Sequence, residues 1–596
     1  MTFFKTLMAS MLGTFLALGL IFLIFILMIV AAVGGSDKAE TKVEANSVLH
    51  IKMDQLIVER GNENDMTFDP TNFESDAKLG LNHFIEDIEK AKNDPNISGI
   101  FFEPTMVLAA PSTMLDLHRA LDDFKSSGKW IVAYGEDFGQ GAYYLASTAN
   151  EVYMYPQGSI DWRGINAELM FFKKLLDKLQ IEAQVIRGPN NKFKSAVEPY
   201  IYDQMSESNK LQIETFISDI WRIMLEGVSA SRGISVADLN KYADSLSFVH
   251  AEKAVEAHMF DGLKYRDEVI GIIKSKLGMD AASKDKDIKF VSLSDYHGAE
   301  KADDGKGPEF KKDKVAVVYA VGAIESGEGD DATIGSERIA NALKKAREDE
   351  KVKAIVLRVN SPGGSALASD VIWRETELIK QSGKPFYVSM GDYAASGGYY
   401  ISCSADKIYA NSNTITGSIG VFGIVPNMQK FWDEKLGVTF DRYETNPHAD
   451  LISINKPLDE TEMKAMQDMV TDIYDDFTGK VANGRKMTQA AVDSIGQGRV
   501  WSGEDARNIG LVDEIGNLQD CIKAAASQAG LSDYAVRDYP DLIDPFQKLI
   551  EDITGQKQSS VMKEVLGDQY YIYRDVKDIA KMKGPQARLP FMIEIR

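Results

Sequence analysis

The chain carries two copies of one pattern, and this internal duplication limits the folds that are open to it. Gly391–Tyr400 reads GDYAASGGYY, and Gly135–Tyr144, 256 positions earlier, reads GEDFGQGAYY. Asp349–Leu357 echoes Asp94–Phe102 at nearly the same spacing. A repeat of this period has the size of a domain rather than of a solenoid unit. We therefore expect two homologous domains in tandem, since a single core rarely grows beyond about 300 residues and this chain has 596.

Apolar runs alternate with helical patterns in the second copy. Val315–Val321 and Ala354–Val359 are β-branched runs of strand length, and apolar side chains recur at helical spacing over 339–346 between them. A helix over 370–381 and a strand over Phe386–Met390 continue the alternation. This order predicts α/β domains with parallel strands.

The duplication and the local composition together divide the chain into six segments. We expect a transmembrane anchor over 6–33, a linker over 34–46, an N-terminal repeat domain over 47–296, a linker over 297–313, a C-terminal repeat domain over 314–556 and a tail over 557–596. The tail has no counterpart in the first copy, and its role stays open.

Residues 6–33 form an almost uninterrupted apolar run without a charge. A helix of this length crosses about 30 Å of hydrocarbon. The alternative, a cleaved secretory signal, has an apolar region of only about 7–15 residues. Lys5 is the only charge before the run and the charges after it are mixed, so the N-terminus is expected in the cytoplasm. We therefore expect a single-pass inner-membrane protein with both domains in the periplasm.

Charge and residue usage exclude several functions. The formal net charge of −22 argues against a nucleic-acid partner, because phosphate binding needs clustered Lys and Arg. The seven histidines form no HExxH motif and the two cysteines are not closely spaced, so we expect no metal site and no cofactor. Cys403 and Cys521 are expected to be buried free thiols, although they could pair in a periplasm-like compartment.

The two copies differ where chemistry is expected. Ser396 in the second copy aligns with Gln140 in the first, so only one copy keeps a hydroxyl nucleophile. Lys194 lies in an apolar stretch of the first copy, and the matching stretch of the second, 438–453, has no lysine. Complementary loss of this kind predicts one active site shared by the copies. Lys194 can act as a base if burial lowers its pKa by about 3 units from about 10.4, and Lys192 beside it is a natural control.

Ser396 follows a strand, and Tyr399, Tyr400 and Ile401 after it open what we expect to be a helix, so its hydroxyl should lie at the helix N-terminus. A second Gly-rich turn, NSPGGS over Asn360–Ser365, also follows a strand and precedes a helix. Glycine N–H groups at such turns can approach a ligand closely and could form an oxyanion hole. For either turn alone, tight packing or anion binding is the simpler interpretation.

These segments jointly resemble a known family. The anchor, FKSAVEPY at 193–200, NSPGGS at 360–365, GDYAASGGYYIS at 391–402 and TGSIGVFG at 416–423 are similar to the long, tandem-domain form of signal peptide peptidase A, a membrane-anchored Ser/Lys protease. The resemblance covers nearly the whole chain. It implies a ClpP/crotonase-like α/β fold in both copies.

The resemblance also implies a set of site residues. Ser396 would be the nucleophile, Lys194 the general base, Ser418 the residue that orients the lysine amine, and Gly363 or Gly364 with Gly397 the oxyanion hole. Ser418 is equally consistent with a plain turn serine, because Gly158–Ile160 repeats its local sequence in the first copy.

The partners are likewise implied by the resemblance. It implies an endopeptidase that degrades remnant signal peptides and other short or unfolded polypeptides through an acyl-enzyme. It also implies a bowl-shaped homotetramer whose active sites face an enclosed cavity near the membrane. Whether the dyad then forms within one chain or between chains stays open.

The sequence allows two other functions. A crotonase-like thioesterase or hydratase would also use paired glycine N–H groups, but a periplasmic domain rarely meets acyl-CoA. A non-catalytic membrane scaffold would have no reason to keep both Ser396 and Lys194.

Overall fold

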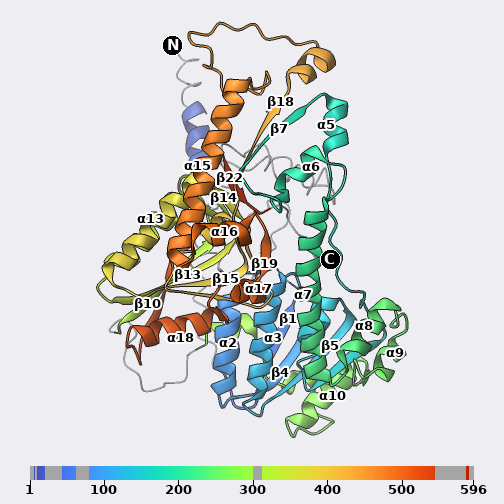
Figure 1. Cartoon of the computed structure of the whole chain (residues 1–596). Helices are drawn as coiled ribbons and strands as arrows, with labels where there is room; N and C mark the ends of the chain where they lie inside the picture. Colours follow the sequence, from blue (N-terminus) through green and yellow to red (C-terminus); the bar gives the residue numbers. More distant parts are fainter. Residues whose placement is uncertain are drawn as a thin grey trace.

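The fold is described from a computed structural model. It describes residue 6 and residues 10–20, 43–54, 56–61, 79–105, 107–299, 312–543 and 585–589. Within these ranges the chain forms two α/β units joined by a mixed sheet (Figure 1).

The N-terminal repeat is built on a parallel sheet in the order β8-β6-β5-β4-β1-β9. Its strands are β1 (Ser47–Met53), β4 (Ile97–Pro104), β5 (Trp130–Phe138), β6 (Glu151–Ile160), β8 (Gly262–Leu263) and β9 (Phe290–Ser292). Its main helices are α2 (Leu81–Asn93), α3 (Pro111–Lys125), α4 (Gln140–Ala146), α7 (Glu207–Arg232), α8 (Val236–Asp244), α9 (Ala251–Glu256) and α10 (Arg266–Lys276). In α2, apolar residues at helical spacing, Phe84, Ile88 and Ala91, face the core.

The C-terminal repeat has the same design, with the parallel order β20-β16-β15-β13-β10-β21. Its strands are β10 (Lys314–Val321), β13 (Val352–Ser361), β15 (Phe386–Ala395), β16 (Lys407–Ala410), β20 (Glu514–Ile515) and β21 (Ala535–Tyr539), and β17 (Ile415–Gly417) and β19 (Val500–Ser502) extend the sheet beyond β15. Its main helices are α12 (Ser336–Glu348), α13 (Ala366–Ser382), α15 (Glu460–Arg485), α16 (Gln489–Gly496), α17 (Gly503–Asn508) and α18 (Leu518–Gln528). The predicted α/β alternation is confirmed, and the strand predicted over Phe386–Met390 runs on to Ala395, directly before Ser396.

A third sheet takes strands from both repeats and from the tail. Its order is β12-β11-β14-β22-β18-β7, with β7 (Glu182–Arg187), β11 (Ala323–Glu325), β12 (Thr333–Gly335), β14 (Gly363–Ser365), β18 (Phe422–Asn427) and β22 (Gln586–Arg588). Strand β7 of the first repeat pairs antiparallel with β18 of the second along its whole length. The chain segment that precedes Lys194 is therefore part of the second repeat's framework.

The two largest hydrophobic clusters follow the same division, apart from one residue. Each repeat has a large buried cluster between its sheet and its helices. Ile186 of β7 is 1% exposed and belongs to the core of the second repeat although it lies in the first half of the chain. Both cysteines are free and buried in the second repeat, as predicted, because Cys403 packs in that core and Cys521, on α18, packs against the other side of the sheet.

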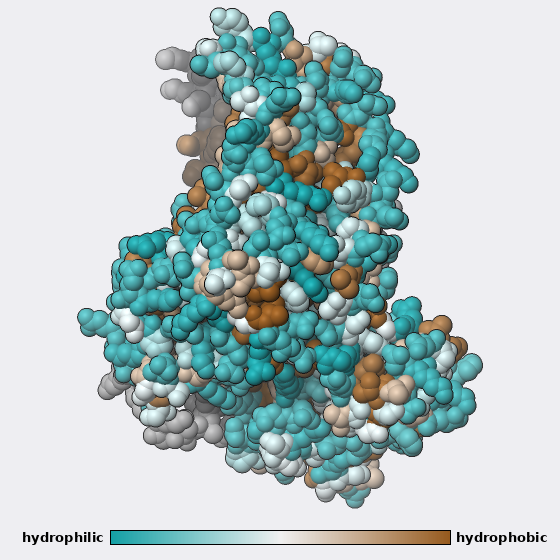
Figure 2. Space-filling model, in the orientation of Figure 1, coloured by the Kyte–Doolittle hydropathy of each residue, from teal (hydrophilic) through white to brown (hydrophobic). Residues whose placement is uncertain are grey.

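The ends of the chain are described only in part. Of the predicted anchor over 6–33, the structure describes residue 6 and residues 10–20, and the remainder lies outside the described residues. Among the described residues, none of the helices is long and apolar enough to cross a bilayer. Of the tail, residues 585–589 are described, and they contribute β22. The face of the molecule drawn in Figure 2 is mainly hydrophilic, in keeping with a charged content of 26%.

Replacing Ile186 with alanine tests whether β7 is an integral part of the second repeat. The substitution leaves a cavity in that core and should lower the free energy of unfolding by about 2–5 kcal/mol, measured by chemical denaturation. Leu175→Ala is the control, because Leu175 lies on the helix just before β7 and is 52% exposed. An equal, small effect of both substitutions would contradict the integration of β7.

Candidate active site

Lys194 lies on the turn that follows β7, and this turn places it against the second repeat. It caps the short 3-10 helix Ser195–Val197, and its backbone N–H donates to Asn191 O at 3.0 Å. Phe193 N–H donates to Gln497 O of the other repeat at 2.9 Å, which fixes the turn in place. The Lys194 residue is 1% exposed, whereas Lys192, two positions earlier, is exposed.

The stem of Lys194 passes between two glycines of the second repeat. A Cβ on Gly498 would lie 2.5 Å from Lys194 Cβ, and a Cβ on Gly420 would lie 3.4 Å from its Cδ. Gly498 also has a φ of +71°, where other residues are strained. The second repeat therefore offers a channel that any side chain at 498 would close.

Ser396 lies where β15 ends. Its φ of 55° is in the left-handed region that a residue other than glycine rarely adopts, and such strain is concentrated at functional sites. Its N–H donates to Gly417 O at 2.8 Å and its carbonyl accepts from Tyr400 N–H at 2.8 Å. The predicted helix after it is confirmed but has a single turn, α14 (Gly397–Tyr400), so individual N–H groups rather than a long helix dipole face the hydroxyl.

The structure brings the three predicted side chains together. Lys194 Nζ lies 2.9 Å from Ser396 Oγ, 2.9 Å from Ser418 Oγ and 3.0 Å from Ser418 O. Ser396 and Ser418 are both fully buried, and Ser418 also has a positive φ, of 52°. Ser418 N–H donates to Arg499 O at 2.6 Å, so the orientation of this turn is fixed from the backbone.

Burial controls the charge of Lys194. Desolvation lowers the pKa of its ammonium well below the usual 10.5, and no carboxylate contributes to that shift. An amine in this environment is neutral over a much wider pH range than a surface lysine, so it can accept a proton.

The glycines predicted for the oxyanion hole cluster beside Ser396. Gly363 has a φ of +94°, and a Cβ on it would lie 2.8 Å from Gly397 N. Its own N–H already donates to Ser361 Oγ at 3.1 Å. Gly364 is paired with Ala587 of the tail strand in the ladder between β14 and β22, so its N–H group faces a ligand only when that strand leaves.

An apolar cluster built by both repeats lies next to the serine. Ile213, Phe216 and Ile220 of α7 pack with Ala395, Ile415 and Val500 of the second repeat and with Leu589 of the tail. The tail strand β22 runs antiparallel to β14, with Gly364 opposite Ala587, and Leu589 N–H donates to Pro362 O at 2.7 Å. An extended segment of this chain therefore lies along the Gly-rich turn beside Ser396.

Several residues that hold Lys194 in place were not predicted from the sequence. Ser195 Oγ donates to Asn209 Oδ1 at 2.9 Å and accepts from Gln212 Nε2 at 2.8 Å, so two residues of α7 hold the turn that carries Lys194. Ser195 belongs to the FKSAVEPY segment and could have been singled out there. Gly498 and the α7 residues could not, because only the tertiary structure brings them to the lysine.

The described side chains include one cluster of metal-binding type, outside this site. It consists of His448, Asp459 and Glu462. Lys456 Nζ already donates to Glu462 Oε1 at 3.0 Å, and Glu462 accepts from the Asp459 N–H at the start of α15. The cluster is thus engaged in an ion pair and a helix cap.

Comparison with known proteins places the chain in a family. The model of "Peptidase family S49" matches residues 123–280 and 379–532, one region in each repeat. Protease 4 of Salmonella typhi is 37% identical over 80% of this chain and 76% of its own length. Protease 4 of Haemophilus influenzae is 33% identical over 88% and 86%, and the chloroplastic serine protease SPPA of Arabidopsis thaliana is 32% identical over 76% and 66%.

These matches distinguish between the three functions that the sequence allows. They favour proteolysis over both the thioesterase or hydratase and the non-catalytic scaffold. The chain belongs to peptidase family S49 and is a serine protease.

Proposed function

We propose that this protease uses a Ser/Lys dyad shared by its two repeats, with Ser396 as nucleophile and Lys194 as general base. The observation that carries the proposal is the 2.9 Å separation of Lys194 Nζ and Ser396 Oγ inside a fully buried site. This distance is within the reach that direct proton transfer requires. No histidine is among the hydrogen-bond partners of either residue in the described part of the chain.

The contacts of the amine suit a neutral lysine. A neutral amine has two N–H donors and one lone pair. Ser418 O and Ser418 Oγ accept the two donors, which leaves the lone pair for the Ser396 hydroxyl. Ser418 Oγ in turn lies 3.4 Å from Gly498 O, an acceptor for its own hydroxyl proton. Ser418 would therefore orient the amine, as the resemblance implies.

The reaction would follow from this arrangement in two stages. Lys194 accepts the hydroxyl proton as Ser396 Oγ attacks the scissile carbonyl carbon, and N–H groups of Gly364 and Gly397 stabilise the oxyanion. The lysine then gives its proton to the leaving amine, so that an acyl-enzyme remains. Water, activated by the same amine, releases the second product.

The substrates would be extended, apolar polypeptides. The antiparallel pairing of β14 with residues 586–588 supports this, because it is the main-chain pairing that an extended peptide makes along a strand edge. The apolar cluster around Leu589 provides a site for a hydrophobic side chain. Remnant signal peptides and other short or unfolded polypeptides have this character, and folded proteins do not.

The family resemblance and the apolar run at 6–33 support a proposal for the membrane attachment, the compartment and the oligomeric state of the enzyme. A single N-terminal helix would anchor the chain in the inner membrane with its N-terminus in the cytoplasm and both repeats in the periplasm. A homotetramer would enclose the active sites. Each repeat would belong to the ClpP/crotonase-like superfamily, a placement that the matching strand orders of the two repeats support.

Replacing either dyad residue should abolish peptide hydrolysis. Ser396→Ala removes the nucleophile and Lys194→Met removes the base with little change of volume, so kcat should fall by about 10⁴-fold or more for each, measured with a fluorogenic peptide. The matched control is Lys192→Met, two residues away and exposed, which should keep wild-type kcat. Normal turnover by Lys194→Met would refute the dyad.

The pH–rate profile should report the buried lysine. Activity needs the neutral amine, so kcat/KM should rise with pH through the pKa of Lys194 and reach its plateau well below pH 10.5, because burial lowers that pKa. The profile is measured from initial rates of peptide hydrolysis in a series of buffers at constant ionic strength. A profile that stays flat into strongly acidic solution would contradict lysine as the base.

The tail strand should compete with substrate. Leu589→Asp places a charge in an apolar cluster and should release residues 585–589, so KM for an extended peptide should fall while kcat stays similar. Val249→Asp is the control, because Val249 is 77% exposed. Equal KM values for the two variants and the wild type would show that the tail does not lie in the substrate's path.

A further inference from the structure

The N-terminus of helix α3 in the first repeat has no cap from its own segment. Its N-cap residue is Ala110, which has no side-chain acceptor for the orphan N–H groups of the first turn. The helix end is nonetheless buried, with Ser112 and Thr113 both under 7% exposed. A buried helix end requires acceptors from elsewhere.

Asp392 of the second repeat supplies that cap. Its Oδ1 accepts from Thr113 N–H at 2.8 Å and its Oδ2 from Thr113 Oγ1 at 2.9 Å. Asn360 Nδ2 also donates to Oδ2, at 3.0 Å. Asp392 is 6% exposed and, although burial raises its pKa, three donors surround its carboxylate.

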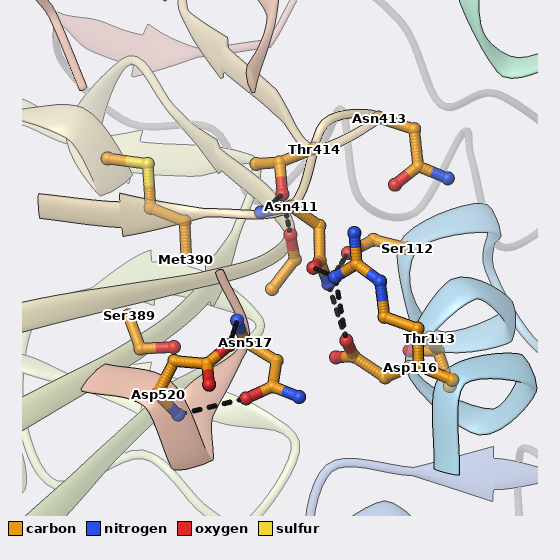
Figure 3. A network of polar contacts seen from close by, with 12 residues as sticks. Ser112, Thr113, Asp116, Ser389, Met390, Asn411, Asn413, Thr414, Asn517 and Asp520 are labelled. Carbon is orange, nitrogen blue, oxygen red and sulfur yellow. Dashed lines mark hydrogen bonds and ion pairs between the residues drawn. The ribbon is translucent and has the colours of Figure 1, made fainter. Parts of the chain in front are cut away.

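A second residue of the same repeat holds the same helix end. Asn411 Nδ2 donates to Ser112 Oγ and to Asp116 Oδ1, both at 2.9 Å, and Arg119 Nη1 donates to Asn411 Oδ1 at 2.6 Å (Figure 3). Figure 3 shows Ser112 and Asp116 of α3 pointing toward Asn411 on the facing loop. The contacts cross from one repeat to the other.

The two anchoring residues precede the two catalytic turns of the second repeat. Asp392 lies on β15, four residues before Ser396, and Asn411 lies on the loop that enters β17, seven residues before Ser418. Thr414 Oγ1 donates to Gly391 O at 2.7 Å, and Thr416 Oγ1 to Ala394 O at 2.7 Å, which ties the two segments together. One helix end of the first repeat therefore contacts both segments that present serines to Lys194.

The duplication itself provides a comparison. Glu136 occupies the position of Asp392 in the first repeat, and it is exposed. A buried carboxylate costs free energy unless it is fully hydrogen-bonded, so its presence only in the copy that carries Ser396 calls for a role specific to that copy.

We propose that Asp392 and Asn411 are positioning residues that tie the start of α3 to the segments carrying Ser396 and Ser418, and thereby hold the two serines against Lys194. The inference rests on the proposed dyad and concerns the segments that carry its serine half. Neither residue touches the reacting atoms. A shift of either serine by about 1 Å relative to Lys194 is enough to lower a rate by about a hundredfold.

The test compares Asp392→Asn with Thr113→Val and with the repeat-matched control Glu136→Gln. In either orientation the new amide NH2 of Asp392→Asn faces a donor, Thr113 N–H on one side or Thr113 Oγ1 and Asn360 Nδ2 on the other. We expect kcat per active site to fall by about tenfold to a hundredfold with KM nearly unchanged. Thr113→Val removes one contact, leaves the second repeat intact and should lower kcat less, and Glu136→Gln should match the wild type.

Two readouts separate positioning from loss of fold. Titration of active sites with a fluorophosphonate counts the competent molecules, and an unchanged kcat per titrated site in both variants would overturn the proposal. Amide hydrogen exchange should rise in 393–401 and 415–420 together in Asp392→Asn, and unchanged exchange in either segment would also overturn it. If the wild type itself neither hydrolyses peptide nor reacts with the probe, the dyad fails, and hydrogen exchange still decides whether α3 holds both segments.

Discussion

The burial of one lysine amine without an acidic partner is the constraint on which the rest of this structure depends. An ammonium in that place would lack compensation for its lost hydration, so the folded protein favours the neutral amine. The hydroxyl of Ser396 and two oxygens of Ser418 surround it. An acid beside the lysine would restore the charge and remove the base. Glycines at 420 and 498, rather than charged side chains, therefore line its stem.

This constraint explains why neither repeat is complete alone. Lys194 follows β7, which completes a sheet of the second repeat, and α7 then returns to brace the lysine turn through Asn209 and Gln212. In the opposite direction, Asp392 and Asn411 of the second repeat satisfy the start of α3. Each repeat thus provides groups that the other leaves unsatisfied. These reciprocal contacts make the two repeats one structural unit, although the repeats follow one another in the sequence.

Much of this could be read from the sequence, for physical reasons. Buried parallel strands require continuous apolar runs, so the strands at 315–321 and 354–359 were predicted within a few residues of β10 and β13. The loss of the serine at Gln140 and of a lysine in 438–453 pointed to one shared site. What could not be read were contacts set by packing between distant segments. Nothing in the sequence distinguishes Gly498 from other turn glycines, and nothing shows that Asp392, although it lies within the GDYAASGGYY segment, caps a helix of the other repeat.

The sequence by itself determined that the chain has two α/β repeats and singled out Ser396 and Lys194, because period, hydrophobic pattern and the differences between copies are local properties of the chain; Ser418 was implied by the family resemblance alone. The tertiary structure alone decided that the lysine is buried without a counter-charge, that the tail strand lies along the Gly-rich turn, and that a helix of one repeat is capped by the other. The burial of a side chain and the capping of a helix by a residue from another repeat depend on which surfaces come into contact. The order of residues in the sequence does not specify those contacts without the fold.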